Sequence, residues 1–306
     1  MTIHTTLPLQ IPLEQKQQDD HIPLYTLKWR HGQLLVKSCQ QARHAYLPAI
    51  EDKKRLIECL KHSPVQLLRI EQAIGEAGLK LWADASEQAN KQVFLRIPSA
   101  YGLFGHRSLL TWTLKRITDW SAAALLLLAL GPLMLMLVLL MRIYSPGPIF
   151  FRQWRVGRRG KLFRIIKFRT MMVDAEKLHH QVMSNQIGLH KLEDDPRITP
   201  IGRWMRKYSL DELPQLFNVL RGEMSLVGPR PWALYDALRI SPEGQKRLNA
   251  LPGITGPWQV GARSTLLDLD EVNNLDLKYL REWSLGHDLQ ILILTVPKVL
   301  FGFGAY

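Results

Sequence analysis

The sequence predicts a mainly α-helical protein with short strands, in which a small soluble α/β domain precedes a membrane-inserted helical segment and a basic C-terminal domain. Three observations carry this prediction. Strand and helix patterns alternate over residues 22–105, an uncharged apolar run follows them, and the rest of the chain is basic and rich in short motifs. The length of 306 residues allows two domains of ordinary size, each with its own core.

The composition is that of a folded protein with an anionic partner. Hydrophobic residues make up 46% of the chain and charged residues 22%, which excludes a wholly disordered, collagenous or multi-span membrane protein. The formal net charge of +13 favours a nucleic acid, an anionic lipid surface or a phosphorylated substrate as partner. The two cysteines, Cys39 and Cys59, can form neither a disulfide framework nor a metal cluster, so a reducing compartment is expected.

The N-terminal third predicts a lead-in followed by a domain. Residues 1–21 are expected to be flexible, and they lack the basic start and apolar core of a secretory signal. Residues 22–105 predict a small soluble α/β domain. Its expected elements are a strand or hairpin over Leu24–Val36 around His31-Gly32, a helix over Ile50–His62, a strand over Val65–Ile70, a helix over Gly75–Ala89 and a strand over Gln92–Ile97. This domain has no phosphate-binding glycine loop and no nucleophile motif, so we favour a regulatory or interaction module over a second active site.

Residues 106–144 predict a helical hairpin that enters and leaves the membrane on one side. The run from Trp120 to Met141 carries no charge and would extend roughly 33 Å as a helix, enough to cross a bilayer. Gly131 and Pro132 lie at its midpoint, where proline removes a backbone donor and favours a sharp bend. Basic residues flank the run on both sides, whereas a spanning helix usually keeps its Lys/Arg excess on one side. Because proline also occurs in spanning helices, a straight spanning helix stays the alternative.

The C-terminal domain, residues 145–306, is expected to carry the chemistry. Ser209 followed three residues later by Glu212 predicts a capping box, with Asp211 and Glu212 in the first turn of a helix. Acidic residues there also complement a helix dipole, so a purely structural role is the alternative. Basic neighbours favour phosphate chemistry, in which one carboxylate attacks phosphorus and the next holds a metal ion. These neighbours are Arg203, Arg206, Lys207, Arg221 and Arg230.

The chain carries several short motifs in order after the start of the apolar run. They are Gly131-Pro132, SPGPIFFRQWRVG from Ser145, KFRTM from Lys167, DPRIT from Asp195, SLDELPQLFNVLRGEMSLVGPRP from Ser209, PGITG from Pro252, DLKY from Asp276, and WSL from Trp283 followed by Asp288. Over residues 108–303 they resemble the bacterial sugar transferase family, the monotopic phosphoglycosyl transferases. Members of that family move a sugar-1-phosphate from a nucleotide diphosphate sugar to a polyprenyl phosphate.

The resemblance implies roles for single residues. Asp211 would be the nucleophile that attacks the sugar-proximal phosphate, releases nucleoside monophosphate and carries the phosphosugar until polyprenyl phosphate accepts it. Glu212 would bind a magnesium ion (Mg²⁺). A set of cations would bind substrate phosphate, namely Arg206, Arg230, Arg263, Lys167 and Arg169. Each of these cations has a solvated or membrane-facing charge as its alternative role.

The resemblance also implies a fold, a location and partners. Gly131 and Pro132 would form the break of a re-entrant helix-break-helix, and residues 145–306 would be the catalytic domain on the cytoplasmic face of a bacterial inner membrane. The donor would be a UDP-sugar by preference, and the acceptor undecaprenyl or another polyprenyl phosphate. Anionic membrane lipids would be further partners, and a homo-oligomer is left open. No nucleic-acid motif is present, so no nucleic acid is expected.

Two departures from the family pattern bear on which sugar the chain would transfer. The chain has Trp258-Gln-Val-Gly-Ala-Arg263 where many members have Trp-Gln-Val-Ser-Gly-Arg, and Leu251 stands where a basic residue is common. The sugar pocket is therefore expected to differ, with a hexose-1-phosphate favoured. The product would begin exopolysaccharide, capsule, O-antigen or glycoconjugate synthesis. The alternative function is a catalytically inactive basic scaffold at the membrane surface, against which the intact Asp211-Glu212 pair argues.

Overall fold

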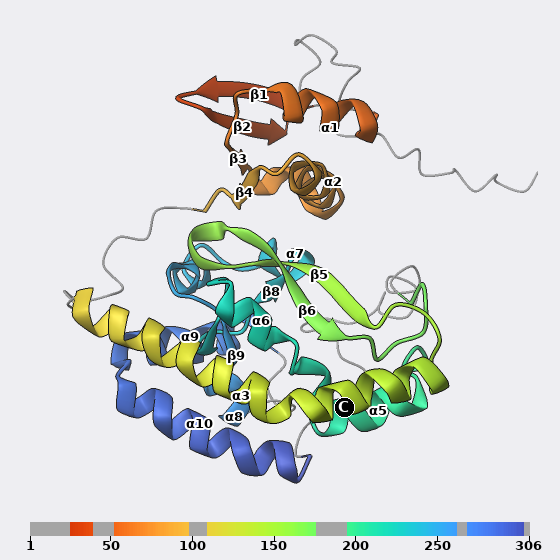
Figure 1. Ribbon diagram of the computed structural model, residues 1–306. Helices are drawn as coiled ribbons and strands as arrows, with labels where there is room; N and C mark the ends of the chain where they lie inside the picture. The colour runs from red at the N-terminus through yellow and green to blue at the C-terminus, as the bar shows by residue number, and fades with distance from the viewer. Residues whose placement is uncertain (1–24, 39–51, 98–108, 176–194, 262–267, 303–306) are drawn as a thin grey trace, which may run out of the picture.

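The computed structural model describes residues 25–38, 52–97, 109–175, 195–261 and 268–302. The predicted lead-in, residues 1–21, lies outside the described residues. The described chain forms two stacked bodies, a small N-terminal α/β domain and a larger C-terminal domain that lies on a long helix (Figure 1).

The N-terminal domain is a four-stranded sheet with two helices, as the alternating patterns predict. Its elements are β1 (Tyr25–Arg30), β2 (Gln33–Ser38), α1 (Lys53–His62), β3 (Leu67–Ile70), η2 (Gln72–Ile74), α2 (Gly75–Gln88) and β4 (Gln92–Leu95). The strands lie in the order β1-β2-β3-β4, antiparallel in the first pair and parallel in the others. His31 and Gly32 form the predicted hairpin turn with positive φ angles of 50° and 71°, which suit a tight two-residue turn. α1 begins where Asp52 accepts a hydrogen bond from the Lys54 N–H at 2.9 Å.

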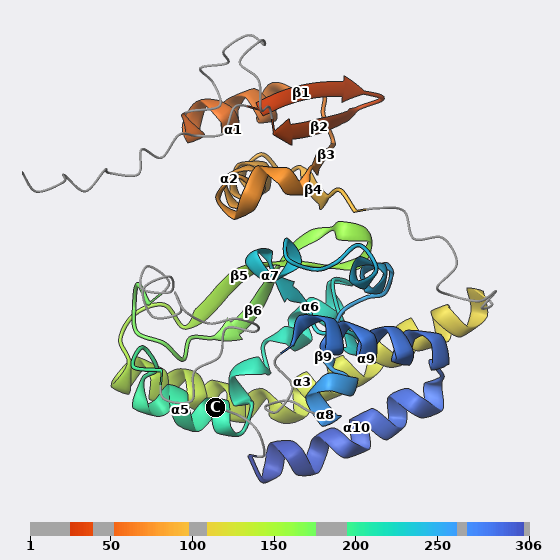
Figure 2. The same cartoon turned by 180° about the vertical axis from the view of Figure 1, so that it is seen from behind.

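The apolar run forms one helix, α3 (Leu109–Tyr144), which lies along the C-terminal domain. Pro132 lies inside it, and the ribbon bends near its middle (Figures 1 and 2). In place of two helices with a break at Gly131 and Pro132, the structure therefore has one bent helix. A proline removes one backbone hydrogen bond and bends the helix, while the turns on either side keep theirs.

The N-terminal part of α3 carries charges that point into the C-terminal domain. The Lys115 ammonium donates to Asp288 Oδ2 at 2.6 Å, and both side chains are buried. Asp119 accepts hydrogen bonds from the Ser225 hydroxyl at 2.8 Å and from the Leu226 N–H at 3.1 Å. Because buried polar groups are costly when unpaired, these bonds fix this part of α3 to the domain.

The C-terminal part of α3 is held by apolar contacts. Met134, Leu137 and Met141 form one buried cluster with Phe168 and Met205 of the C-terminal domain. Both parts of the bent helix therefore pack on the same body.

The C-terminal domain is built around an antiparallel hairpin of β5 and β6. Its strands are β5 (Phe150–Val156), β6 (Leu162–Phe168), β7 (Ser225–Val227), β8 (Trp232–Ala233) and β9 (Gly253–Thr255). Its helices are η3 (Arg158–Gly160), α5 (Pro200–Lys207), η4 (Leu210–Glu212), α6 (Gln215–Leu220), α7 (Leu234–Ala237), η5 (Gly244–Asn249), α8 (Pro257–Gly261), α9 (Leu269–Glu282) and α10 (Leu285–Leu300). One sheet has the order β6-β5-β8, and β7 pairs in parallel with β9.

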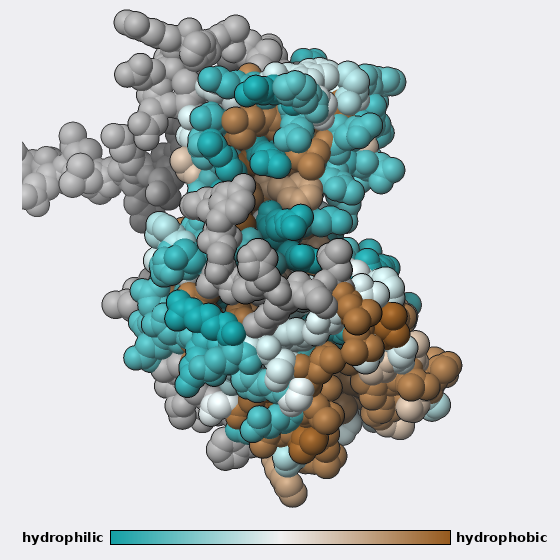
Figure 3. Space-filling model, turned by 90° about the vertical axis from the view of Figure 1, so that its left-hand side faces the viewer, coloured by the Kyte–Doolittle hydropathy of each residue, from teal (hydrophilic) through white to brown (hydrophobic). Residues whose placement is uncertain are grey.

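The two helices α3 and α10 expose many large apolar side chains. On and just after α10 these are Leu289, Ile293, Leu294, Val296, Leu300 and Phe301, and on α3 they include Leu125, Leu128, Leu135, Met136, Leu139 and Ile143. Figure 3 shows hydrophobic residues gathered on the part of the molecule away from the N-terminal domain. The most apolar part of α3 is largely exposed, whereas the core helix of a soluble domain is mostly buried. α3 is the one helix in the described ranges that is long and apolar enough to cross a membrane.

Candidate active site

Asp211 and Glu212 lie on a tight turn between α5 and α6. They belong to the 3₁₀ turn η4, which the Glu212 N–H closes by donating to the Ser209 carbonyl at 3.1 Å. Ser209 has a left-handed backbone, with φ 54° and ψ 21°, and its side chain makes no capping hydrogen bond. The predicted capping box is therefore wrong, because that motif needs an extended N-cap residue. The carboxylates are presented by a short turn rather than by the start of an α-helix.

Lys167 of β6 connects this turn to the sheet. Its Nζ lies 2.6 Å from Glu212 Oε1, and the two side chains are 17% and 19% exposed. Burial lowers the pKa of Lys167, while the charges of Glu212 and Asp211 oppose that shift. The predicted phosphate-binding Lys167 is therefore in the site, where it interacts with both carboxylates.

Asp211 is buried, with 8% of its surface exposed, and interacts with Arg206. Arg206 lies in the last turn of α5, and its Nε donates to the Thr170 hydroxyl at 2.8 Å. Burial lowers the pKa of Arg206, and the nearby charges of Asp211 and Asp195 oppose the shift. The predicted nucleophile Asp211 and the predicted phosphate-binding Arg206 are thus brought together, although the two residues are on different elements.

Arg230 lines a small cleft together with Lys167 and Glu212. Its guanidinium lies 5.1 Å from the centre of the Trp258 ring, in the geometry of a cation–π contact. Its carbonyl accepts a hydrogen bond from Arg247 Nη2 at 2.6 Å, and Arg247 is itself buried in an ion pair with Asp276. The buried pair therefore holds the backbone that presents Arg230.

Sequence reasoning missed Arg155, which lines the cleft with Lys167, Glu212 and Arg230. Its guanidinium donates to the Pro231 carbonyl at 3.2 Å and to the Gln153 side chain at 2.6 Å. β5 contains two arginines, and strand alternation places them on opposite faces. Only the register of the hairpin tells which face looks into the cleft, and no local pattern supplies that register. Gln215 and Gln259 line the cleft as well.

A buried carboxylate, Asp236 of α7, interacts with the arginines of the cleft. It is 4% exposed, and its Oδ1 has no hydrogen-bond partner among the residues that the structure describes. Burial raises its pKa to about 6, although the charges of Arg155 and Arg230 act in the opposite direction. No sequence motif singles out this residue, and Arg155, its largest charge partner, lies on a distant strand.

Arg169, one of the predicted phosphate-binding residues, does not line this cleft. Arg169 is buried, and its guanidinium donates to the carbonyls of Ser145, Pro146, Pro148 and Met171 at 2.5, 3.1, 2.6 and 3.1 Å. Its donors are used in fixing the turn after α3, so we do not retain it as a phosphate ligand. Arg263 lies outside the described residues.

The site has oxygen donors suited to a magnesium ion. In the described ranges, no group of three or more His, Cys, Asp or Glu side chains could hold a metal by itself. Magnesium is often bound by one or two carboxylates, with water and substrate phosphate completing the shell. Asp211 and Glu212, adjacent on one turn, fit that arrangement.

The comparison with protein families gives one match. A model described as bacterial sugar transferase matches residues 110–302, from the start of α3 to the end of α10. The match confirms the resemblance predicted for residues 108–303. Residues before 110, including the N-terminal domain, lie outside it.

Curated relatives match the same part of the chain. The chain is 46% identical over 194 residues to the galactosyl transferase CpsE of Streptococcus agalactiae serotype III, an alignment of 62% of this chain and 43% of that protein. It is 40% identical over 224 residues to the undecaprenyl-phosphate glucose phosphotransferase of Komagataeibacter xylinus, covering 68% and 40%. It is 43% identical over 200 residues to the UDP-glucose:undecaprenyl-phosphate glucose-1-phosphate transferase of Caulobacter vibrioides, covering 63% and 72%. The chain thus spans about two fifths of the length of the first two relatives.

Proposed function

Because the chain belongs to the bacterial sugar transferase family, we propose that it transfers a sugar-1-phosphate, with a hexose-1-phosphate favoured, from a nucleotide diphosphate sugar to polyprenyl phosphate. Two of the relatives carry undecaprenyl phosphate and glucose in their names, and one of these names includes UDP-glucose. The observation that carries the proposal is the pair Asp211 and Glu212, held on one turn among Lys167, Arg206 and Arg230. Such a site can bind a diphosphate and offer it a carboxylate nucleophile.

In the proposed reaction, Asp211 carries the sugar phosphate between the two substrates. A carboxylate oxygen of Asp211 attacks the phosphorus next to the sugar, and the bond from that phosphorus to the bridging oxygen breaks. Nucleoside monophosphate leaves with the bridging oxygen and its electron pair. A phosphate oxygen of polyprenyl phosphate then attacks the same phosphorus and the Asp211 carboxylate leaves, giving a polyprenyl diphosphate sugar and free enzyme.

The remaining cleft residues would bind and neutralise the phosphates. Arg155, Lys167 and Arg230 line the cleft with positive charge, and guanidinium groups match phosphate oxygens in a forked geometry. The Glu212 side chain would bind Mg²⁺ through its carboxylate. When bound, that ion would offset negative charge on the diphosphate. Lys167 would keep the Glu212 carboxylate at the cleft through their ion pair.

We further propose that α3 is re-entrant and that the catalytic domain lies on the cytoplasmic face of the inner membrane. In support, Lys115 and Asp119 on one side of the bend, and Leu137 and Met141 on the other, pack on the same domain. A spanning helix would have to carry one of these ends across the bilayer, away from its partners. The exposed apolar side chains of α3 and α10 could instead enter one leaflet, which would bring the cleft to headgroup depth (Figure 3).

Nucleoside monophosphate release tests the proposed activity. The protein in lipid nanodiscs, with polyprenyl phosphate, Mg²⁺ and a panel of nucleotide sugars, should release nucleoside monophosphate from at least one hexose donor. With donor alone, intact-mass analysis should show one added sugar phosphate, which Asp211→Asn should lack and the exposed-acid control Asp270→Asn should keep. Membrane binding without release from any donor would support the inactive scaffold instead.

A further inference from the structure

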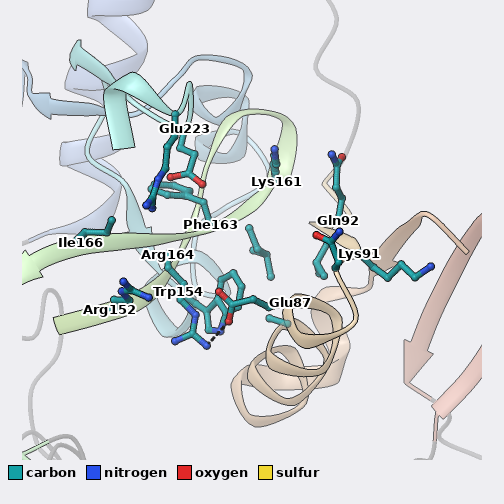
Figure 4. Close-up of a pocket in the computed structure, with 15 residues that line it drawn as sticks. Glu87, Lys91, Gln92, Arg152, Trp154, Lys161, Phe163, Arg164, Ile166 and Glu223 are labelled. Atoms are coloured by element: carbon teal, nitrogen blue, oxygen red, sulfur yellow. Dashed lines mark ion pairs between the residues drawn. The ribbon is translucent and has the colours of Figure 1, made fainter. Parts of the chain in front are cut away.

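The β5–β6 hairpin has two faces that look in opposite directions. Directly paired residues of the two strands share a face, and alternate residues point to opposite faces. Arg155 and Lys167 lie on the face that lines the cleft. Trp154 and Arg164 lie on the other face, toward the N-terminal domain (Figure 4). One hairpin is therefore the wall between the cleft and a domain that lies outside the family match.

Two carboxylates of α2 bind the rear face of this hairpin. Asp84 Oδ1 accepts hydrogen bonds from Trp154 Nε1 at 2.8 Å and from Arg164 Nη2 at 2.9 Å. Glu87 Oε2 lies 2.8 Å from the same Arg164 nitrogen, and this ion pair is drawn as a dashed line in Figure 4. The Arg164 guanidinium in turn lies 4.6 Å from the centre of the Trp154 ring. Charge-assisted hydrogen bonds of this kind are stronger and more directional than neutral ones.

The two domains also meet through backbone and core. Phe94 of β4 forms an antiparallel bridge with Lys161, just before β6. A Cβ on Gly160 would lie 2.2 Å from the Leu95 carbonyl oxygen, so the backbones approach too closely for any side chain there. Trp154 belongs to the same buried cluster as the core of the N-terminal domain. The domain is therefore docked in a fixed position.

The C-terminal domain supports the other face of the hairpin, where Phe163 and Ile165 of β6 are buried with Leu216 and Val219 of α6. β8 pairs with β5 at only two positions in the described chain, Arg155 with Ala233 and Val156 with Trp232. On the outer edge of β6, the Asn218 side chain accepts from the Ile166 N–H at 3.0 Å. A pocket of about 240 Å³ lies beside this contact, and Glu87, Trp154 and Arg164 are among the residues that line it (Figure 4). Small sheets need a packed face for stability, so the contacts with α2 matter to the position of the hairpin.

We propose that Asp84 and Glu87 are positioning residues for sugar phosphate transfer. By holding Trp154 and Arg164 from behind, they fix the hairpin that presents Arg155 and Lys167 to the substrate phosphates. The N-terminal domain thereby forms the back wall of the active site and sets its geometry. The predicted effect on kcat/KM rests on the proposed function. The predicted effect on hydrogen exchange depends only on the contacts of the hairpin.

A double-mutant cycle tests the proposal. Asp84→Asn/Glu87→Gln keeps shape and removes charge, and it should lower kcat/KM for nucleoside monophosphate release about tenfold. Arg164→Met removes the other partner of these ion pairs and should lower kcat/KM by a similar factor. The triple variant should lose about tenfold rather than a hundredfold, because the ion pairs of Arg164 with Asp84 and Glu87 are already lost in either parent variant. A matched control is Glu58→Gln/Glu71→Gln, which neutralises two acids whose ion pairs stay within the N-terminal domain.

Hydrogen exchange supplies a readout that does not depend on activity. Backbone amides of β5 and β6 should exchange at least tenfold faster in Asp84→Asn/Glu87→Gln, while those of α9 keep the wild-type rate. If the double variant does not fold, Glu87→Gln alone gives the same comparison. Wild-type kcat/KM and exchange in the double variant, or effects that multiply in the triple variant, would overturn the proposal. Faster exchange in a chain that releases no nucleoside monophosphate from any donor would overturn the proposed function and leave the hairpin contact standing.

Discussion

Lys167 illustrates how much a single residue does in this site. Its ammonium pairs with Glu212 at 2.6 Å and interacts with Asp211, so one cation on the sheet holds both carboxylates of the turn. The same ammonium lines the cleft in which the donor diphosphate would lie. Without this ammonium, the negative charges of the two carboxylates would repel each other and the donor diphosphate.

Replacing Lys167 by Met should therefore damage catalysis strongly. Loss of one partner of a buried charge pair costs about 2–4 kcal/mol, so kcat/KM for nucleoside monophosphate release should fall about 30- to 1,000-fold. The exposed Lys161, just before the same strand, provides the control Lys161→Met. An unchanged kcat/KM in Lys167→Met would remove this residue from the site.

Arg169 should behave as a structural residue. Arg169→Met should lower the free energy of unfolding by about 2–4 kcal/mol, because buried carbonyls lose a charged donor. The donor KM should stay within twofold of wild type. Chemical denaturation in detergent and steady-state kinetics measure the two quantities, with the exposed Arg152→Met on β5 as control. A tenfold higher donor KM at unchanged stability would return Arg169 to the phosphate site.

At the scale of elements, α3 combines an apolar surface with buried polar anchors. Its composition alone predicted a long membrane-inserted helix, and the proline predicted a bend. The inward direction of Lys115 and Asp119 was not predictable, because their partners Asp288 and Ser225 come 173 and 106 residues later. Those anchors are what argue for a re-entrant helix.

Labelling of the two ends of α3 tests its topology. Leu110 and Tyr144 are 77% and 71% exposed, so each can be replaced by Cys in a chain whose own cysteines are Ser. A membrane-impermeant maleimide should label both positions from the same side of inner-membrane vesicles. Glu243→Cys, on the exposed surface of the catalytic domain, marks that side. Labels reaching the two ends from opposite sides would show a spanning helix.

At the scale of the whole molecule, local patterns predicted more of the fold than of the site. Turn residues and apolar periodicity gave the elements of the N-terminal domain, since these depend on near neighbours. Asp211, Glu212 and Lys167 were predicted as site residues because they lie in recognisable motifs, and the structure brings the three together. Arg155 was missed because it depends on strand register, and the docking of the N-terminal domain depends on contacts between distant segments. Such long-range contacts leave no local signal.

Asp236 should lower the free energy of unfolding as pH rises, whereas an ordinary paired carboxylate raises it. Its folded pKa is raised to about 6 by burial, with Glu76 adding to the shift and Arg155, Arg230 and Arg239 opposing it. Its unfolded pKa is about 3.9, so between pH ~4 and ~6 the folded protein keeps a proton that the unfolded chain releases. This contribution to the free energy of unfolding is complete below pH ~4 and is lost as pH rises to ~6, by about 2–3 kcal/mol.

Asp236→Asn cannot ionise, so it should remove that loss. Relative to wild type, the variant should gain about 2–3 kcal/mol between pH 4 and pH 7, measured by chemical denaturation in detergent. The exposed-acid control Glu282→Gln should show the wild-type dependence. Parallel stability curves for Asp236→Asn and wild type would place an ionised Asp236 in the folded protein at pH 4.

The bond between Lys115 and Asp288 also dictates an order of assembly during synthesis. At roughly 5–20 residues per second, a ribosome adds Asp288 about 9–35 s after Lys115. Over that interval the domain that fixes the long apolar helix is still incomplete, and lipid suits the apolar surface of that helix. α10 therefore completes the attachment of α3, and a chain that stops short of α10 leaves the Lys115 ammonium with Asp119, at 3.8 Å, in place of Asp288 as its acidic partner.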